Sequence, residues 1–372
     1  MTTARGLAVE ALVRIDEGAY ANLLLPALLE RSGLSERDRH LVTELVYGTT
    51  RMRRAVDWLV DAHLRKPVEP EVRAALRLGA YQLAFLGTPP HAAVGETVEA
   101  TPVRARSVVN AVLRKVATSL PPRWPDEATS LSYPDWVIDE LDRALGRDAA
   151  YRALVVMDSA PAVSRRPDGY VQDRASQWVA ELVDVQAGDV VVDLCAGPGG
   201  KATGMAAARP ALVAALDAQP SRAGLVAGNA TRLGRTNVAT LVADGRRPAL
   251  RPASADRVLV DAPCSGLGVL RRRPDARWRI GADDVPQLAA LQRDLLGAAV
   301  ELLRPGAVLV YSVCTLTMAE TVEIDEWLAT AHAALEPIPA PGPPWEAVGR
   351  GARLLPQAAD TDGMYLLRLR RP

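Results

Sequence analysis

The 372-residue chain has few cysteines, one phenylalanine and three lysines. An odd number of three cysteines argues against a disulfide scaffold and is typical of a reducing cytoplasm. No apolar run approaches the length of about 18 residues that a membrane-spanning helix needs. The N-terminal residues become charged before any long apolar run, so we expect no secretory signal. These absences predict a cytoplasmic protein that does not associate with a membrane.

The chain also lacks an excess of charge of either sign. Lys and Arg together number 44, as do Asp and Glu, so the net charge is zero. The overall charge therefore gives no support to nucleic-acid binding, although a local basic face would not appear in it. A hydrophobic content of 49% with 24% charged residues is typical of a globular protein. The length favours two domains.

Apolar residues recur at helical spacing from residue 3 to about residue 120, with no strand-like alternation. Ser35 and Asp38 resemble a capping box that begins a helix. Further helices are predicted over 52–63, 69–86, 92–100 and 104–117. We therefore expect an all-α domain over 1–120.

A proline-rich segment at 119–126 predicts a boundary. Helical patterns return over 131–160 and 177–183, with a short polar link at 164–170 between them. We assign 121–180 to this linker region.

Short apolar runs bounded by turn residues characterise the rest of the chain, 181–372. They predict strands at 190–195, 212–217, 238–244, 257–263 and 307–314, with helices at 221–233 and 286–303 between them. This alternation is typical of an α/β domain whose parallel sheet is buried on both faces. The terminal run MYLLRLRR predicts a late strand at the sheet edge.

A glycine-rich loop follows the first predicted strand, where open parallel sheets bind ligands. Its spacing matches neither G-x-G-x-x-G nor the phosphate-binding P-loop. Asp193, Asp217 and Asp244 end the first three strands, and such acidic groups suit S-adenosylmethionine, which carries an adenosine and positive charge. The alternative is that this loop binds no ligand and is an ordinary strand-to-helix turn, in which glycine only makes a tight turn possible. The loop residues expected to bind this cofactor are Cys195, Ala196, Gly197, Pro198, Gly199, Gly200 and Lys201.

All three cysteines, Cys195, Cys264 and Cys314, lie at or just after the ends of predicted strands. Buried structural cysteine is the usual interpretation. However, no cysteine occurs in the first 194 residues, and all three cluster on the side of the sheet where a ligand is expected. This clustering favours a catalytic role for at least one of them. A thiolate could add to an electron-poor ring carbon, and a second thiol could act in a later proton transfer. We expect no metal, because there is no C-x-x-C pair and the four histidines lie outside these motifs.

Three motifs in order, DLCAGPGGKA, DAPCSGLGVLRRRPDARW and YSVCTL, resemble those of the Sun/Nol1/Nop2 family of RNA cytosine-C5 methyltransferases. LVYGTTRMRRAVDWL and SVVNAVLRKV resemble the NusB-like domain that RsmB-type members carry. The resemblance covers nearly the whole chain. It implies a NusB-like helical domain followed by a Rossmann-like, S-adenosylmethionine-dependent methyltransferase domain that acts on small-subunit (16S) ribosomal RNA.

The same resemblance implies a role for each site residue. Cys314 would add to carbon 6 of cytosine, and Cys264 would assist loss of the carbon-5 proton and release of the enzyme. Asp261 would hydrogen-bond the cytosine edge and line the cofactor site. The glycine-rich loop, Asp217 and Asp244 would hold S-adenosylmethionine, with Arg222 as a further candidate.

The chain departs from the family pattern at the link over 164–170. Relatives usually carry an RNA-binding subdomain there, and this chain has about ten residues. Two alternatives therefore stay open: the same chemistry on transfer RNA or another acceptor, and a non-catalytic RNA-binding assembly factor. We expect a monomer.

The densest basic cluster directly follows the second motif and carries an aromatic residue. Such a cluster suits phosphate contacts and base stacking, although a solvated loop is the alternative. The residues predicted to bind RNA are Arg271, Arg272, Arg273, Arg277 and Trp278.

Overall fold

A computed structural model describes residues 3–372, and it divides into two compact units. The first unit is helical, runs to Asp139 and also includes Leu270–Arg279. The second unit contains Glu140–Val269 and Ile280–Pro372 and is built on a mixed sheet. The predicted fold class, helical and then α/β, is confirmed. The helical unit differs from the expected 1–120, since it extends further and takes a ten-residue segment from the later part of the chain.

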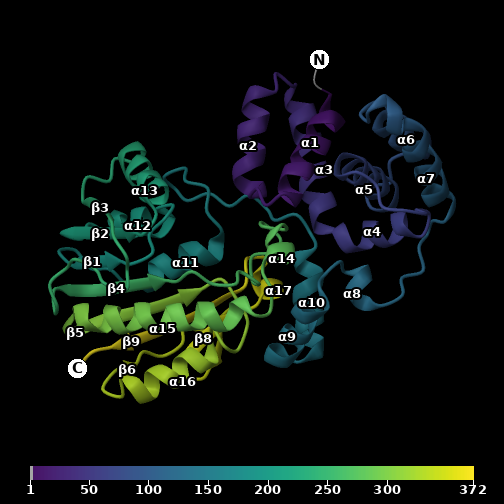
Figure 1. The fold of residues 1–372 in the computed structure, drawn as a ribbon. Helices are drawn as coiled ribbons and strands as arrows, with labels where there is room; N and C mark the ends of the chain where they lie inside the picture. The colour runs from purple at the N-terminus through teal and green to yellow at the C-terminus, as the bar shows by residue number, and fades with distance from the viewer. Residues whose placement is uncertain (1–2) are drawn as a thin grey trace. The chain divides into compact units, whose positions relative to one another are not determined.

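The helical unit is organised around its fifth helix (Figure 1). Helix α5 contacts α1, α3, α4, α6 and α7, and almost its whole length is buried. The helices of this unit are α1 Ala4–Asp16, α2 Ala21–Arg31, α3 Glu36–Arg51, α4 Arg53–Asp61, α5 Pro70–Ala84, α6 Pro90–Glu99, η1 Val103–Ala105, α7 Arg106–Thr118, α8 Glu127–Ser130 and α14 Ala276–Arg279, while α9 Asp135–Leu145 begins in it.

Local signals explain where two of these helices begin. The Ser35 hydroxyl accepts a hydrogen bond from the Asp38 N–H at 3.2 Å and donates one to the Asp38 carboxylate at 2.8 Å, which confirms the predicted cap of α3. Proline is the first residue of α5, where its missing N–H costs nothing.

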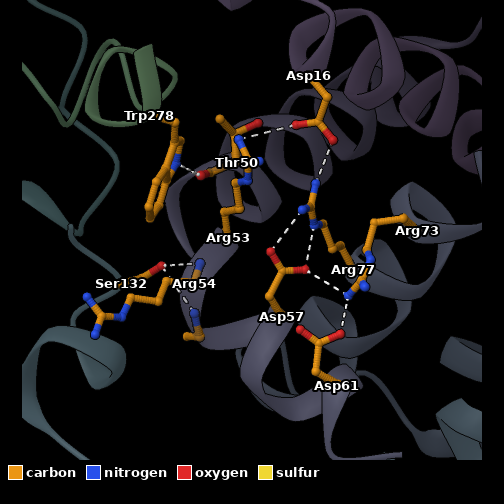
Figure 2. Close-up of polar contacts among 11 residues, drawn as sticks. Asp16, Thr50, Arg53, Arg54, Asp57, Asp61, Arg73, Arg77, Ser132 and Trp278 are labelled. Carbon is orange, nitrogen blue, oxygen red and sulfur yellow. Dashed lines mark hydrogen bonds and ion pairs between the residues drawn. The ribbon is translucent and has the colours of Figure 1, made fainter. Parts of the chain in front are cut away.

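A buried arginine ties α5 to two other helices (Figure 2). The Arg77 guanidinium donates to the Asp57 carboxylate at 2.7 and 2.8 Å and to Asp16 at 2.5 Å. Arg73 reaches Asp57 and Asp61 one turn earlier on α5. The attraction to these carboxylates offsets part of the cost of burying the Arg77 guanidinium.

The second unit contains a sheet in the order β3-β2-β1-β4-β5-β9-β8-β7, with β6 paired to β9. Strands β1 to β5 are parallel, and β9 runs antiparallel to β5. The strands are β1 Val190–Asp193, β2 Leu212–Asp217, β3 Val238–Val242, β4 Ala255–Asp261, β5 Leu303–Val313, β6 Glu336–Pro337, β7 Glu346–Val348, β8 Gly351–Leu354 and β9 Met364–Arg370. The predicted strand at the C-terminus is confirmed, but it lies inside the sheet and not at its edge, because β8 and β7 follow it.

Helices cover both faces of this sheet (Figure 1). One core holds residues of α15 and α16, and the other holds residues of α11, α12 and α13. The helices of this unit are α10 Arg147–Met157, α11 Arg174–Leu182, α12 Gly200–Met205, η2 Ala206–Ala208, α13 Pro220–Arg232, α15 Asp284–Leu302, α16 Val322–Ala331 and α17 Pro356–Ala359. No helix among residues 3–372 is long and apolar enough to cross a membrane.

Candidate active site

The strand order brings the predicted chemical groups to one edge of the sheet. Strand β1 lies between β2 and β4, and β5 follows β4. All four run parallel, so Asp193, Asp217, Asp261 and Cys314 end up at the same carboxyl edge. The chain reverses its direction of winding between β1 and β4, which is where open α/β sheets bind ligands.

The two predicted catalytic thiols are in contact. The Sγ atoms of Cys264 and Cys314 lie 3.3 Å apart. A hydrogen bond to Cys314, together with burial, raises the pKa of the Cys264 thiol well above its usual range. Either sulfur can donate the hydrogen bond between them. Because the charge of Cys314 is among the causes that raise the pKa of Cys264, the two thiols are not both ionised at once.

Lys201 supplies a positive charge beside these thiols. Its Nζ donates to the Asp261 carboxylate at 2.6 Å and to the Ser176 hydroxyl at 2.9 Å. Burial lowers the pKa of Lys201, but attraction to Asp261 outweighs it, so the net pKa is raised. The ammonium group therefore stays charged and links the glycine-rich loop to the end of β4.

The glycine-rich loop approaches the end of β2 too closely for a side chain. A Cβ atom on Gly197 would lie 2.4 Å from the Asp217 carboxylate, which explains the glycine. The same carboxylate accepts hydrogen bonds from the Gly197 N–H at 3.1 Å, the Gln219 N–H at 2.9 Å and Arg222 Nε at 3.0 Å. Asp217 and Arg222 are thus brought together with the loop, as the sequence predicts.

The Asp193 carboxyl group is almost fully buried beneath the loop. Its Oδ1 accepts a weak hydrogen bond from the Cys195 N–H at 3.4 Å, while its Oδ2 has no partner among the described residues. Burial and the nearby Asp261 carboxylate raise the pKa of Asp193 to about 7. A buried acceptor without a donor is costly, so this oxygen is suited to a ligand that brings a donor or a positive charge.

The remaining predicted cofactor residues differ in their surroundings. Burial, followed by the Asp193 and Asp261 carboxylates, raises the pKa of the Cys195 thiol far above neutrality, so Cys195 is no nucleophile in this state. Asp244 is part-exposed and makes a bidentate ion pair with Arg246. Its carboxylate lies just after the end of β3, three strands away from β4 and four from β5, which the two thiols follow.

Two groups of contacts around the site have no clear sequence signal. The Glu320 carboxylate is fully buried and accepts hydrogen bonds from Ser265, Gln292 and Thr317. Arg166, in the shortened link, donates to the Gly200 carbonyl at 2.6 Å at the start of α12. A glutamate and an arginine in loops are common surface residues, and only the packed structure shows that they hold the site together.

The predicted RNA-binding cluster belongs to the helical unit and is partly buried. Arg277 is fully buried, stacks on the Tyr133 ring at 3.9 Å, and donates to the carbonyl oxygens of Arg51 and Ser132. Arg271 is also buried. This burial contradicts a direct phosphate contact by either residue in this conformation, because their charged groups are committed inside the protein.

The other members of the cluster keep more exposure. Arg273 is exposed and Arg272 is half-buried. The half-buried Trp278 donates its indole N–H to the Thr50 carbonyl at 2.7 Å (Figure 2). The basic segment is therefore a structural part of the helical unit that presents only some of its charge to solvent.

The parallel strands β1 to β5, with their acidic ends and the glycine-rich loop, form an edge of the kind where α/β sheets bind ligands. The family match assigns this domain to the class of S-adenosylmethionine-dependent methyltransferases. Residues 180–370 match the family described as 16S rRNA methyltransferase RsmB/F, and residues 2–118 match the NusB family. The chain belongs to the RsmB/F family of RNA methyltransferases and carries an N-terminal NusB domain.

Full-length relatives agree with this assignment. The chain is 37% identical to ribosomal RNA small subunit methyltransferase B of Thermus thermophilus, covering 99% of this chain and 98% of the relative. It is also 37% identical to the putative methyltransferase Rv1407 of Mycobacterium tuberculosis, covering 99% and 96%. The latter alignment spans 444 positions, more than the 372 residues of this chain, so that relative carries residues that this chain lacks.

One solved structure has the same fold over nearly the whole length. The crystal structure of PH0851 superposes with a TM-score of 0.82 and covers 99% of both chains at 20% sequence identity. At that level of identity the likeness concerns the fold alone.

Proposed function

We propose that the protein transfers a methyl group from S-adenosylmethionine to carbon 5 of a cytosine in 16S ribosomal RNA. The observation that carries this proposal is the contact between Cys264 and Cys314 beside Lys201 and Asp261. Two adjacent thiols suit a reaction in which one forms and later breaks a covalent bond to the base while the other assists. Membership of the RsmB/F family and the name of the Thermus relative support the ribosomal substrate.

The carboxylates beside the glycine-rich loop are suited to hold S-adenosylmethionine. Asp193 offers an unpaired buried oxygen, and Asp217 offers a carboxylate at the end of β2, at the position where an acidic residue typically accepts ribose hydroxyls. Asp193, Asp217, the loop Cys195–Lys201 and Asp244 would hold the cofactor, with Arg222 keeping Asp217 in place. When bound, S-adenosylmethionine supplies an electrophilic methyl group.

We assign the steps on the base to the two cysteines. The Cys314 thiolate attacks carbon 6 of cytosine, a carbon–sulfur bond forms, and carbon 5 becomes nucleophilic. Carbon 5 then takes the methyl group. A base then takes the carbon-5 proton, the electrons of that bond form the double bond between carbons 5 and 6, and Cys314 leaves as a thiolate. Cys264 would be that base once it has released its own proton to solvent. Asp261, which accepts a hydrogen bond from Lys201, would accept a second one from the cytosine edge.

The target base must leave its stack to expose its ring face. The exposed Arg273 and the half-buried Arg272 and Trp278 are the members of the basic segment that we retain as RNA contacts. Transfer RNA remains an alternative acceptor, because the link over 164–170 is short.

A single assay tests the proposed function. The full-length protein is incubated with labelled S-adenosylmethionine and total RNA from a strain that lacks the gene, and methylated cytosines are located. We expect label at carbon 5 of a cytosine in 16S RNA. Label confined to transfer RNA would favour the other acceptor, and no label in any RNA would contradict the reaction.

A further inference from the structure

A buried network connects the residues that directly follow the two cysteines. Ser265 follows Cys264, and Thr315 follows Cys314. Their hydroxyl oxygens lie 2.7 Å apart, and both residues are buried. The two loops come from the ends of different strands, β4 and β5, so this contact joins them beside the thiols.

Glu320 is the centre of this network. Its Oε1 accepts hydrogen bonds from the Ser265 N–H at 2.8 Å and from the Gln292 amide at 3.0 Å. Its Oε2 accepts from the Ser265 hydroxyl at 2.5 Å and from the Thr317 hydroxyl at 2.9 Å. The single proton of Ser265 thus points to Glu320, and the Thr315 hydroxyl donates to Ser265. Both cysteine loops depend on one fully buried carboxylate.

The same carboxylate is supported from the helix that covers this face. Gln292 on α15 also donates to the carbonyl of Pro263, the residue before Cys264, at 2.9 Å. The Tyr311 hydroxyl on β5 lies 2.7 Å from the Glu320 carbonyl oxygen and 2.9 Å from the Gln292 side-chain oxygen. The loop of Cys264 is therefore held on both sides of the cysteine. A fully paired buried carboxylate fixes its neighbours in one arrangement.

We propose that Glu320 is a positioning residue that sets the contact between the Cys264 and Cys314 thiols by fastening their two loops to each other. It touches neither thiol through a hydrogen bond that the structure shows, and acts through Ser265, Thr315 and Thr317. The importance for methyl transfer rests on the proposed function, whereas the effect on the thiol contact does not.

Two variants of Glu320 separate geometry from charge. Glutamine has the same shape as glutamate. Its side-chain oxygen can accept hydrogen bonds from the Ser265 N–H and the Gln292 amide, and its NH₂ group can donate to the hydroxyls of Ser265 and Thr317. Glu320→Gln should therefore keep the two cysteine loops joined. Alanine removes every contact of the carboxylate, so Glu320→Ala releases the two loops. If the contact between the two thiols is lost in Glu320→Ala and kept in Glu320→Gln, then Glu320 acts by positioning the two loops and not through its charge.

Asp325 provides a matched control on the same segment. It is also buried, and its carboxylate accepts from Arg350 Nε at 2.7 Å and from the Arg350 N–H at 2.8 Å. Among residues 3–372, no hydrogen bond joins its side chain to either cysteine loop. Asp325→Ala is expected to destabilise the α/β unit by breaking a buried ion pair, without changing the thiol contact in the molecules that remain folded.

The decisive measurement uses the free enzyme and needs no RNA. Diamide, a thiol oxidant, takes one hydrogen from each thiol, and a sulfur–sulfur bond joins Cys264 to Cys314, which mass spectrometry detects. We expect rapid closure in the wild type, Glu320→Gln and Asp325→Ala, and closure slowed at least about tenfold in Glu320→Ala, since misplacement by about 1 Å can cost about a hundredfold. Wild-type closure in folded Glu320→Ala, or equal slowing in Asp325→Ala, would overturn the proposal.

Methyl transfer gives the second readout. Glu320→Ala should lower kcat while the KM for S-adenosylmethionine stays close to that of the wild type, because the hydrogen bonds of the Glu320 carboxylate go to Ser265, Gln292 and Thr317 and not to the glycine-rich loop. Glu320→Gln should restore kcat. If no variant, including the wild type, methylates RNA but the disulfide results hold, the proposed function fails and the positioning role stands. Unchanged kcat in folded Glu320→Ala contradicts the role in catalysis.

Discussion

Cofactor binding is expected to depend strongly on pH because of one buried carboxyl group. The pKa of Asp193 is raised to about 7 by burial and by the Asp261 carboxylate, and Oδ2 has no partner among residues 3–372. A ligand that brings a donor or positive charge to this oxygen binds the ionised form. Its affinity must therefore rise with pH until Asp193 is ionised.

The size of the effect follows from the pKa. With a pKa of about 7, roughly 1% of Asp193 is ionised at pH 5 and roughly half at pH 7, so the affinity for S-adenosylmethionine should rise about fiftyfold, or about 2.3 kcal/mol. Each molecule bound near pH 6 should release close to one proton.

Calorimetric titration at pH 5, 6 and 7 measures both quantities. Repeating it in two buffers of different ionisation enthalpy counts the protons released. Asp193→Asn is the matched control, because it keeps the shape and cannot titrate, so its affinity should be weak and nearly flat with pH. The reasoning fails if the wild-type affinity is independent of pH, or if Asp193→Asn shows the same slope.

Three further predictions concern other parts of the molecule. Asp217→Ala should weaken S-adenosylmethionine binding by about 1.5–3 kcal/mol, the cost of lost hydrogen bonds to a charged group, and unchanged calorimetric affinity would exclude Asp217 from the cofactor site. Arg277→Ala should destabilise the protein by about 3 kcal/mol, because three buried acceptors lose a charged donor; a wild-type midpoint in denaturant unfolding would contradict this. Arg273→Ala should flatten the salt dependence of RNA binding by roughly 0.7–0.9 in log–log slope if it contacts one phosphate, and an identical slope would mean that Arg273 is only solvated surface.

The cofactor side of the site could be predicted from the sequence because it depends on strand ends. Asp193, Asp217, Asp261 and Cys314 each end a short apolar run, and parallel strands bring their carboxyl ends to one edge whatever lies between them. The need for glycine at position 197 could also be predicted from the loop, and the structure leaves no room there for a Cβ atom. In each case the local sequence carries the physical reason.

The parts that could not be predicted depend on contacts between distant segments. Arg277 looks like a member of a solvated basic run, yet its partners, Arg51 and Ser132, lie 226 and 145 residues away in the chain. The strand at 364–370 has the pattern of an added edge strand, and only its pairing with β8 shows that it is internal. Glu320 has no motif of its own, because its role comes from four donors on three separate elements.

The most direct test of the account is which cysteine forms the covalent bond to RNA. Cys264→Ala and Cys314→Ser are each incubated with S-adenosylmethionine and 16S RNA and run on a denaturing gel. In Cys264→Ala, Cys314 can still add to the cytosine, but the elimination that releases the enzyme is blocked, so a slowly migrating protein–RNA band should accumulate. Cys314→Ser should give no such band. A band with Cys314→Ser and none with Cys264→Ala would reverse the two roles, and no band with either variant would contradict the covalent mechanism.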